Sequence, residues 1–155
     1  MTVSVQIIDA TAAHARALGR VLRQSDRAEI MAYGVVPEDG AYVSFRNSLL
    51  RRTAVVNGLV AAMWGVVGTP LGRVGTPWLL TGYPCLQVSP VRFFKIYRRE
   101  AQDMLRLFPV LENHVDFRYT AAMRMLRLAG FQLDAPMPFG VDGDLFCRFE
   151  ARAYV

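Results

Sequence analysis

Hydrophobic and polar residues alternate at the start of the chain, which predicts a β-strand over residues 3–8. The next segment is rich in Ala and Leu and follows Thr11, a residue that accepts hydrogen bonds well at a helix start. A second short helix is predicted from Ser25 to Tyr33, and a third helical segment around residues 42–50. The first third of the chain is therefore expected to be one strand followed by helices.

Two apolar runs, residues 53–56 and 59–67, are separated by Asn57-Gly58. This dipeptide between two apolar runs is the strongest short hairpin signal, because both turn residues need a positive φ. Residues 68–77 contain three glycines and two prolines and are predicted to form a loop. A short apolar strand over residues 78–82 is expected after it.

The clearest helix of the chain is predicted between Ser89 and Pro109. Ser89 can accept the free N–H groups of the first turn, Pro90 suits the first helical position, and Pro109 ends the helix. One apolar stripe runs along it: Phe94, Tyr97, Ala101, Met104, Leu105 and Phe108. The periodicity indicates a helix packed on one side and solvated on the other.

The remaining segments continue the alternation of strands and helices. Residues 110–117 are predicted to be a strand, 118–129 a helix ended by Gly130, and 131–139 and 144–155 two strands around a turn. The expected class is α/β (α+β), a mixed and mostly antiparallel sheet of about six or seven strands flanked by about four helices. We expect residues 1–155 to form a single domain.

Composition is that of a packed protein, with 53% hydrophobic and 20% charged residues. The N-terminal segment does not resemble a signal peptide, and no run reaches the roughly 18 apolar residues that span a bilayer. Cys85 and Cys147 match no metal-ligand spacing, so we expect buried free thiols in a reducing compartment and no metal.

The net charge is +5, and much of the excess lies in the long helix and in the helix after residue 118. Such a balance is typical of a solvated helix face or of a protein that binds an anionic cofactor. Nucleic-acid binding is not favoured, because the charged face of the long helix lacks interleaved aromatic residues.

The order of elements resembles that of the GNAT N-acetyltransferase superfamily over essentially the whole chain. That family commonly has the pattern Asn-x-x-Ala-x-x-Leu-Tyr-x-x-x-Gly-Phe in its last helix, and Ala122, Gly130 and Phe131 match it. Three positions depart from it: Tyr119 stands at the Asn position, Met125 at the Leu position and Leu126 at the Tyr position. The usual acid of the family is thus replaced by an aliphatic residue.

The resemblance implies acetyl-CoA or coenzyme A as the ligand of an active protein. The family's glycine-rich phosphate loop corresponds to "GYPCLQVSPVRFF", which has no glycine pair, so Ser89 and Arg92 are the candidates for an anion. Backbone donors for the thioester are implied near Leu80, Thr81 and Gly82 on the fourth strand.

Glu29 in the second helix is a candidate base by its place in the topology. His114 is a second candidate, because it lies between Asn113 and Asp116 and strict alternation places Glu112, His114 and Asp116 on one strand face. For the missing acid three tyrosines remain open: Tyr83, Tyr97 and Tyr119.

A narrower resemblance is to the internal virion proteins of T7-like tailed phages and related prophage proteins, a degenerate GNAT branch. It rests on residues over roughly half the chain: Tyr97, Arg98, Met104, Leu105, Asn113, Val115, Arg124, Leu126 and Gly130. It implies a structural role in virion assembly or the internal core, phage virion proteins as partners, and a location in the bacterial cytoplasm or the virion.

Two functions follow from these resemblances, an interaction module without efficient catalysis and an acyl-CoA-dependent N-acetyltransferase. An enzyme predicts an open gap between the fourth and fifth strands with free backbone N–H groups. A module predicts that large side chains such as Phe93, Tyr83 or Leu86 fill this gap.

Overall fold

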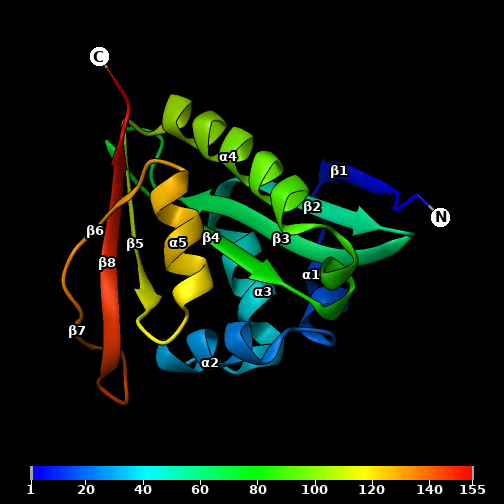
Figure 1. Ribbon diagram of the computed structural model, residues 1–155, viewed down its shortest axis with the longest axis horizontal. Coiled ribbons are helices and arrows are strands. Elements are labelled where there is room, and N and C mark those ends of the chain that lie inside the picture. Colours follow the sequence, from blue (N-terminus) through cyan, green and yellow to red (C-terminus); the bar gives the residue numbers. More distant parts are fainter. Residues whose placement is uncertain (1, 155) are drawn as a thin grey trace.

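The computed structural model describes residues 2–154 and shows one eight-stranded sheet with helices on both faces (Figure 1). The strands are β1 (Val5–Asp9), β2 (Ser48–Val56), β3 (Leu59–Val67), β4 (Val74–Thr81), β5 (Val110–Asp116), β6 (Gln132–Leu133), β7 (Met137–Phe139) and β8 (Asp144–Arg152). The helices are α1 (Ala12–Gly19), α2 (Gln24–Ala32), α3 (Pro37–Asn47), α4 (Pro90–Leu107) and α5 (Thr120–Leu128), with a 3-10 helix η1 (Tyr83–Gln87). This confirms the predicted fold class.

Strands β1 to β4 form an antiparallel meander, and its central hairpin is the predicted one. The turn between β2 and β3 is Asn57-Gly58, with φ of 49° and 81°. The order of the sheet is β1-β2-β3-β4-β5-β8-β6, with β7 paired to β8. Only the contact between β4 and β5 among these pairs is parallel, because α4 crosses over between the two strands.

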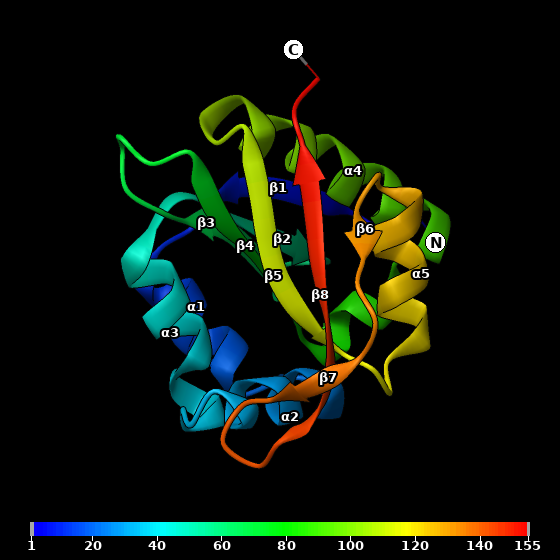
Figure 2. The same cartoon turned by 90° about the vertical axis from the view of Figure 1, so that its left-hand side faces the viewer.

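The helices cover the two faces of the sheet separately (Figure 2). On one side, called here the α4/α5 face, a cluster of buried side chains includes Trp64, Met104 and Phe108. On the other, the α1/α3 face, a smaller cluster includes Leu18, Met63 and Leu80. Alternation along each strand supplies both cores, so the sheet is a two-sided layer.

The long helix begins and ends where the sequence predicts. The Ser89 hydroxyl accepts from the Arg92 N–H at 3.3 Å, and Pro90 is the first helical residue. Tyr97, Ala101 and Met104 are buried along its inner side. The outer side is exposed and basic, which leaves this helix amphipathic as expected.

Several boundaries differ from the expected ones. The second helix is Gln24–Ala32 instead of 25–33, and the first strand of the hairpin begins at Ser48 instead of Thr53. The third helix is Pro37–Asn47 instead of 42–50, because Pro37 starts the helix and Ser48 already pairs with β3. Strand β4 begins at Val74 inside the expected loop. The expected strand over 131–139 is two short strands separated by an Asp-Ala-Pro segment. The last strand ends at Arg152, and Val155 lies outside the described residues.

Both cysteines are buried thiols without a disulfide, as predicted. Burial raises the pKa of Cys85 to about 11, so this thiol stays protonated at neutral pH. No helix within residues 2–154 combines the length and hydrophobicity that crossing a membrane requires.

Candidate functional site

Strands β4 and β5 are bonded to each other only at one end and then diverge. Their parallel register consists of Val74 with Val110 and Gly75 with Leu111. A cavity of about 1500 Å³ occupies the opening, and residues from both faces of the sheet line it. The sheet is therefore open near its centre, where a parallel ladder would normally be closed.

Residues of β4 alternate in the direction of their backbone groups, and this decides which groups face the opening. Gly82 donates its N–H to the Ala61 carbonyl at 2.7 Å, so Gly82 and Leu80 point toward β3. Thr81 and Leu79 consequently point toward β5. Two of the three positions predicted as donors near the thioester, Leu80 and Gly82, thus have backbone groups on the other edge.

The N-terminus of α2 already binds Thr81. The Thr81 N–H donates to Asp26 Oδ1 at 3.2 Å, its hydroxyl donates to Asp26 Oδ2 at 2.8 Å, and its carbonyl accepts from the Arg23 N–H at 3.0 Å. Leu79 lies beyond the last pair with β5, and within residues 2–154 its N–H has no acceptor. Leu79 is therefore the backbone donor that β4 offers to the cavity.

Side chains satisfy the facing edge of β5. The His114 N–H donates to Asn113 Oδ1 at 2.8 Å, and the Asp116 N–H donates to Glu29 Oε1 at 3.3 Å. Asn113 also donates through Nδ2 to the Pro77 carbonyl at 2.7 Å, and it accepts from the Tyr33 hydroxyl at 2.9 Å. These side chains replace the missing ladder and hold the opening at a defined width.

Glu29, the predicted base, projects from α2 into the cavity. Burial raises its pKa to about 7, and the nearby charges of Asp26 and Asp116 add to this effect. Its hydrogen bond from Asp116 opposes the rise, while Glu29 Oε2 has no partner within residues 2–154. Glu29 is thus a carboxylate that exchanges a proton near neutral pH.

Asp116 next to it stays ionised. Burial favours the neutral form, but hydrogen bonds from Arg118 outweigh this and hold the pKa of Asp116 below its usual value. The Arg118 guanidinium donates to the Asp116 carboxylate over distances of 2.6 to 3.2 Å. Burial conversely raises the pKa of Asp26. The environments of these three carboxyl groups therefore separate their proton affinities.

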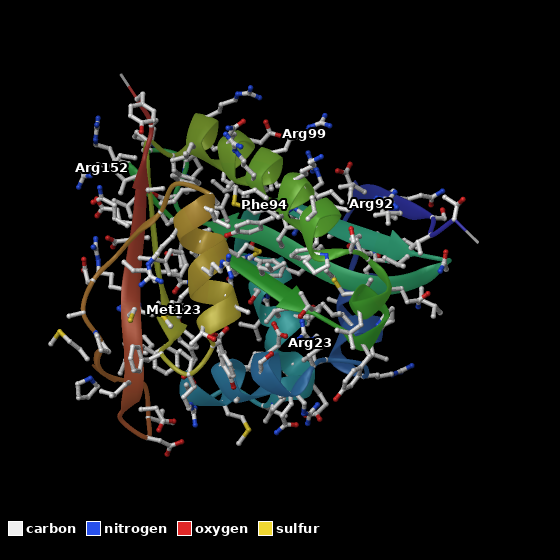
Figure 3. All side chains as sticks on the ribbon, in the orientation of Figure 1. Arg23, Arg92, Phe94, Arg99, Met123 and Arg152 are labelled. Atoms are coloured by element: carbon white, nitrogen blue, oxygen red, sulfur yellow. The ribbon has the colours of Figure 1, made fainter. Side chains whose placement is uncertain are left out.

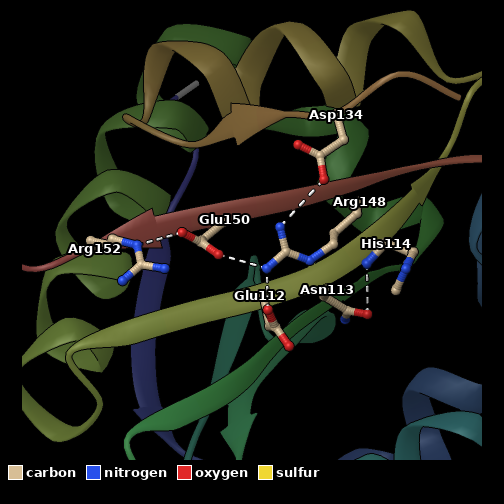
Figure 4. Close-up of polar contacts among 7 residues, drawn as sticks. All are labelled: Glu112, Asn113, His114, Asp134, Arg148, Glu150 and Arg152. Atoms are coloured by element: carbon tan, nitrogen blue, oxygen red, sulfur yellow. Dashed lines mark hydrogen bonds and ion pairs between the residues drawn. The ribbon is translucent and has the colours of Figure 1, made fainter.

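His114, the second predicted base, lies at the wall of the cavity in a different setting. Its ring stacks on Phe139 with 4.1 Å between centroids. Burial lowers the pKa of His114 below its usual value, and Arg148 lowers it further. Glu112 shares the His114 face of β5, as predicted, but its carboxylate binds Arg148 (Figure 4). His114 is consequently a neutral aromatic wall residue.

The loop before α4 differs from the predicted anion site. The Arg92 guanidinium donates to the Val3 carbonyl at 2.8 Å, close to β1 (Figure 3). Ser89 uses its hydroxyl as the helix cap. Neither Ser89 nor Arg92 lines the cavity, whereas Val91 of α4 and Arg124 of α5 do. Within residues 2–154 the Val91 N–H has no acceptor. The helix start therefore offers the Val91 N–H to an anion in the cavity, and Arg124 lines the same cavity.

The three candidate tyrosines occupy different places. Tyr83 is 56% exposed and is not among the residues that line the cavity. Tyr119 lines it near Glu29 and Asp116, at the start of α5. Tyr97 lines it on the α4/α5 face together with Leu126, and both are buried. Tyr97 is thus the candidate tyrosine on the same side of the sheet as Leu126, the residue that stands at the position of the family's tyrosine acid.

Several groups of the site were not identified from the sequence. Asp26 lies three residues before Glu29 on one helix face, so helical spacing is the signal that would have found it. Asn113 and Leu79 act through the separation of two strands that are distant in sequence. No local pattern predicts that separation.

No family model matches the sequence, and no curated protein matches it. Solved structures match nearly all of it. The acetyltransferase of the GNAT family from Streptococcus pneumoniae is 12% identical with a TM-score of 0.69, and the match covers 97% of this chain and 100% of that chain.

Two further structures give the same result. A ribosomal-protein-alanine N-acetyltransferase from Brucella melitensis is 14% identical with a TM-score of 0.71, covering 96% of this chain and 99% of that one. The spermidine N-acetyltransferase from Vibrio cholerae, in complex with CoA and spermine, is 12% identical with a TM-score of 0.67, covering 96% and 95%. The chain has the fold of the GNAT acetyltransferases.

Proposed function

We propose that the protein is an acyl-CoA-dependent N-acyltransferase. The observation that carries this proposal is the opening between β4 and β5, occupied by one cavity that residues from both faces of the sheet line. Phe93 and Leu86 line the cavity without filling it, and Tyr83 is exposed. This matches the arrangement expected of a transferase. A structure with the same fold is described with acetyl-CoA as its cofactor.

The residues on the α4/α5 face fit the thioester arm of acyl-CoA. The arm is a narrow, largely apolar chain with two amides, and Val88, Phe94 and Leu126 supply apolar walls. The N–H group of Val91, together with Arg124, replaces the glycine pair as the anion contact. When bound, acyl-CoA supplies a thioester whose C–S bond breaks as the amine nitrogen forms a C–N bond.

The chain's own residues perform the proton and charge transfers. Glu29 Oε2 accepts the proton that the amine nitrogen loses, and its pKa of about 7 suits this at neutral pH. The Leu79 N–H donates to the acyl oxygen as negative charge develops there.

Tyr97 is assigned to the leaving sulfur. Burial raises its pKa above the usual value, so the phenol stays protonated. With acyl-CoA bound, the Tyr97 hydroxyl would donate a hydrogen bond to the leaving sulfur, and solvent would supply the proton of the released thiol. Hydrogen-bond donation by Tyr97 would stabilise the leaving sulfur less than the acid catalysis of the tyrosine that the family has at the position of Leu126.

The second candidate function is the virion interaction module. Leu126 and the loop without a glycine pair favour it, because both depart from the enzymes at positions that serve catalysis. It requires no binding of coenzyme A, so cofactor binding separates the two functions.

Isothermal titration of acetyl-CoA and CoA at low salt tests the proposal. We expect micromolar binding that weakens about tenfold in Arg124→Ala and stays unchanged in Arg127→Ala, a matched arginine of α5 outside the cavity. Release of free thiol is then followed with a panel of amines. Absence of binding at high protein concentration would overturn the proposal and direct the work to pull-downs with virion proteins.

A further inference from the structure

The part of the cavity on the α1/α3 face is the place where an acceptor would lie, and its chemistry is distinctive. Its walls are apolar over α2, α3, the segment between them, β3 and β4: Ile30, Val35, Val43, Val67, Trp78 and Leu80. The Trp78 Nε1–H is already bound to the Ser48 hydroxyl at 2.6 Å. The indole therefore presents only carbon surface to a ligand.

Carboxylate groups that could bind an ammonium are scarce in this compartment. Asp26 uses one oxygen on the Thr81 N–H and the other on its hydroxyl. Asp116 is bound to Arg118. Glu29 Oε2 is the carboxylate oxygen of the lining that remains without a partner within residues 2–154.

The other charged groups of the lining do not offer a partner to a second positive charge on the acceptor. Arg23 and Arg118 also line the cavity, and Arg118 is paired with Asp116 and Asp144. Glu112 lies nearby on β5, but its carboxylate is bound to Arg148. His114 stacks on Phe139 and presents an aromatic face. A positively charged group of the acceptor thus finds a carboxylate partner at one place in the cavity, beside Glu29.

From this distribution we propose that the acceptor is a primary amine attached to an apolar body, such as an arylalkylamine or a straight alkylamine, and that polyamines are disfavoured. The inference rests on the proposed acyl transfer. The amine nitrogen lies at Glu29, and the apolar body lies between Trp78, Val43 and Val67. A second ammonium would be buried against carbon without a carboxylate partner, which is costly.

The test compares amines with acetyl-CoA as donor and thiol release as the readout. We expect kcat/KM for 2-phenylethylamine and n-hexylamine to exceed that for spermidine by at least about tenfold. Direct titration of 2-phenylethylamine into the protein with CoA present is a second readout that needs no turnover. Micromolar-to-millimolar binding of phenylethylamine and none of spermidine is the expected result.

A charge placed in the apolar wall makes the test specific. Val43→Asp, on the exposed middle of α3, should lower binding of phenylethylamine and raise that of 1,6-diaminohexane. Val36→Asp, at the exposed N-cap of the same helix and outside the cavity, is the matched control and should change neither.

The outcomes separate the two claims. If acetyl-CoA binds and spermidine or a lysine peptide is the better acceptor, or if Val43→Asp behaves as Val36→Asp does, the acceptor assignment is wrong and the transferase stands. If acetyl-CoA does not bind, the proposed function is wrong. CoA-dependent binding of phenylethylamine without turnover supports the assignment of the compartment.

Discussion

The side-chain amide of Asn113 donates a hydrogen bond to the backbone carbonyl of Pro77, 2.7 Å away, at the point where β4 and β5 separate. The Asn113 side chain thereby bonds β5 to β4 beyond the last backbone pair of the two strands, Gly75 with Leu111. The same side chain accepts from the Tyr33 hydroxyl, so α2 is tied to this point as well. The opening therefore has a fixed inner end.

Replacing Asn113 by Asp tests this role. The carboxylate keeps the two acceptor contacts but loses the donor and faces the Pro77 carbonyl. We expect the free energy of unfolding to fall by about 1–3 kcal/mol and acetyl-CoA binding to weaken in parallel. Asn47→Asp is the control, because Asn47 also donates to a backbone carbonyl, that of Val43, and Asn47 itself does not line the cavity. Equal effects on cofactor binding in both variants would rule out the special role of Asn113.

Leu79→Pro removes the one N–H that β4 offers to the cavity. The same edge already accommodates Pro77 two residues earlier, so a proline nitrogen is tolerated in this direction. We expect kcat to fall about a hundredfold, with the circular dichroism spectrum retained. Leu79→Ala keeps the N–H and serves as the control. A kcat for Leu79→Pro equal to that of Leu79→Ala would contradict the donor role.

The predictable parts of the fold are those with local causes. Asn57-Gly58 fixes the hairpin through the φ of two adjacent residues, and Ser89-Pro90 fixes the start of α4. The predicted loop over residues 68–77 was wrong from Val74 onward, because the place of Pro77 in β4 depends on a distant strand and not on a local cause. A proline is expected outside a central strand, but its nitrogen faces the opening, where no ladder bond is needed. The start of β4 thus depended on a distant separation of strands.

The site shows the same division. Glu29 was predicted from its place in the topology, whereas its proton affinity depends on burial beside Asp26 and Asp116, which come from two elements. Arg92 was predicted at the phosphate site from its place at the helix start, but its side chain reaches Val3 instead. A sequence specifies which groups are near a helix end more readily than where a long side chain points.

Tyr97→Phe tests the assignment of the leaving-group hydroxyl. Deleting one hydrogen bond to a thiolate should lower kcat about ten- to hundredfold and leave acetyl-CoA affinity nearly unchanged. Tyr83→Phe is the matched control, since Tyr83 is 56% exposed. A loss of kcat in Tyr119→Phe, with none in Tyr97→Phe, would move the role to the start of α5.

The pH dependence of turnover reports on Glu29. Because burial raises the pKa of Glu29 to about 7, kcat/KM should rise with pH through an apparent pKa near 7 for an acceptor that is present as free amine. Glu29→Gln should lose this step and at least about a hundredfold in kcat. An unchanged pH profile in the variant would show that another group accepts the proton.

The stability of the fold should respond to the same carboxyl group with a definite sign. The pKa of Glu29 is about 7 in the folded protein and 4.5 ordinarily, so between these values the folded state binds more protons than the unfolded state. Stability from this group is therefore present below pH 4.5 and is lost as the pH rises through 7. The loss amounts to about 3 kcal/mol at pH 8. Urea unfolding at pH 5 and pH 8 measures it as the difference between wild type and Glu29→Gln, which keeps an acceptor for the Asp116 N–H.

Glu38→Gln, a substitution at an exposed carboxylate paired with Arg27, should not reproduce the shift. A difference between wild type and Glu29→Gln that is constant from pH 5 to pH 8 would mean that Glu29 is ionised at an ordinary pKa, and Glu29 would then be too weak a base for the proposed role.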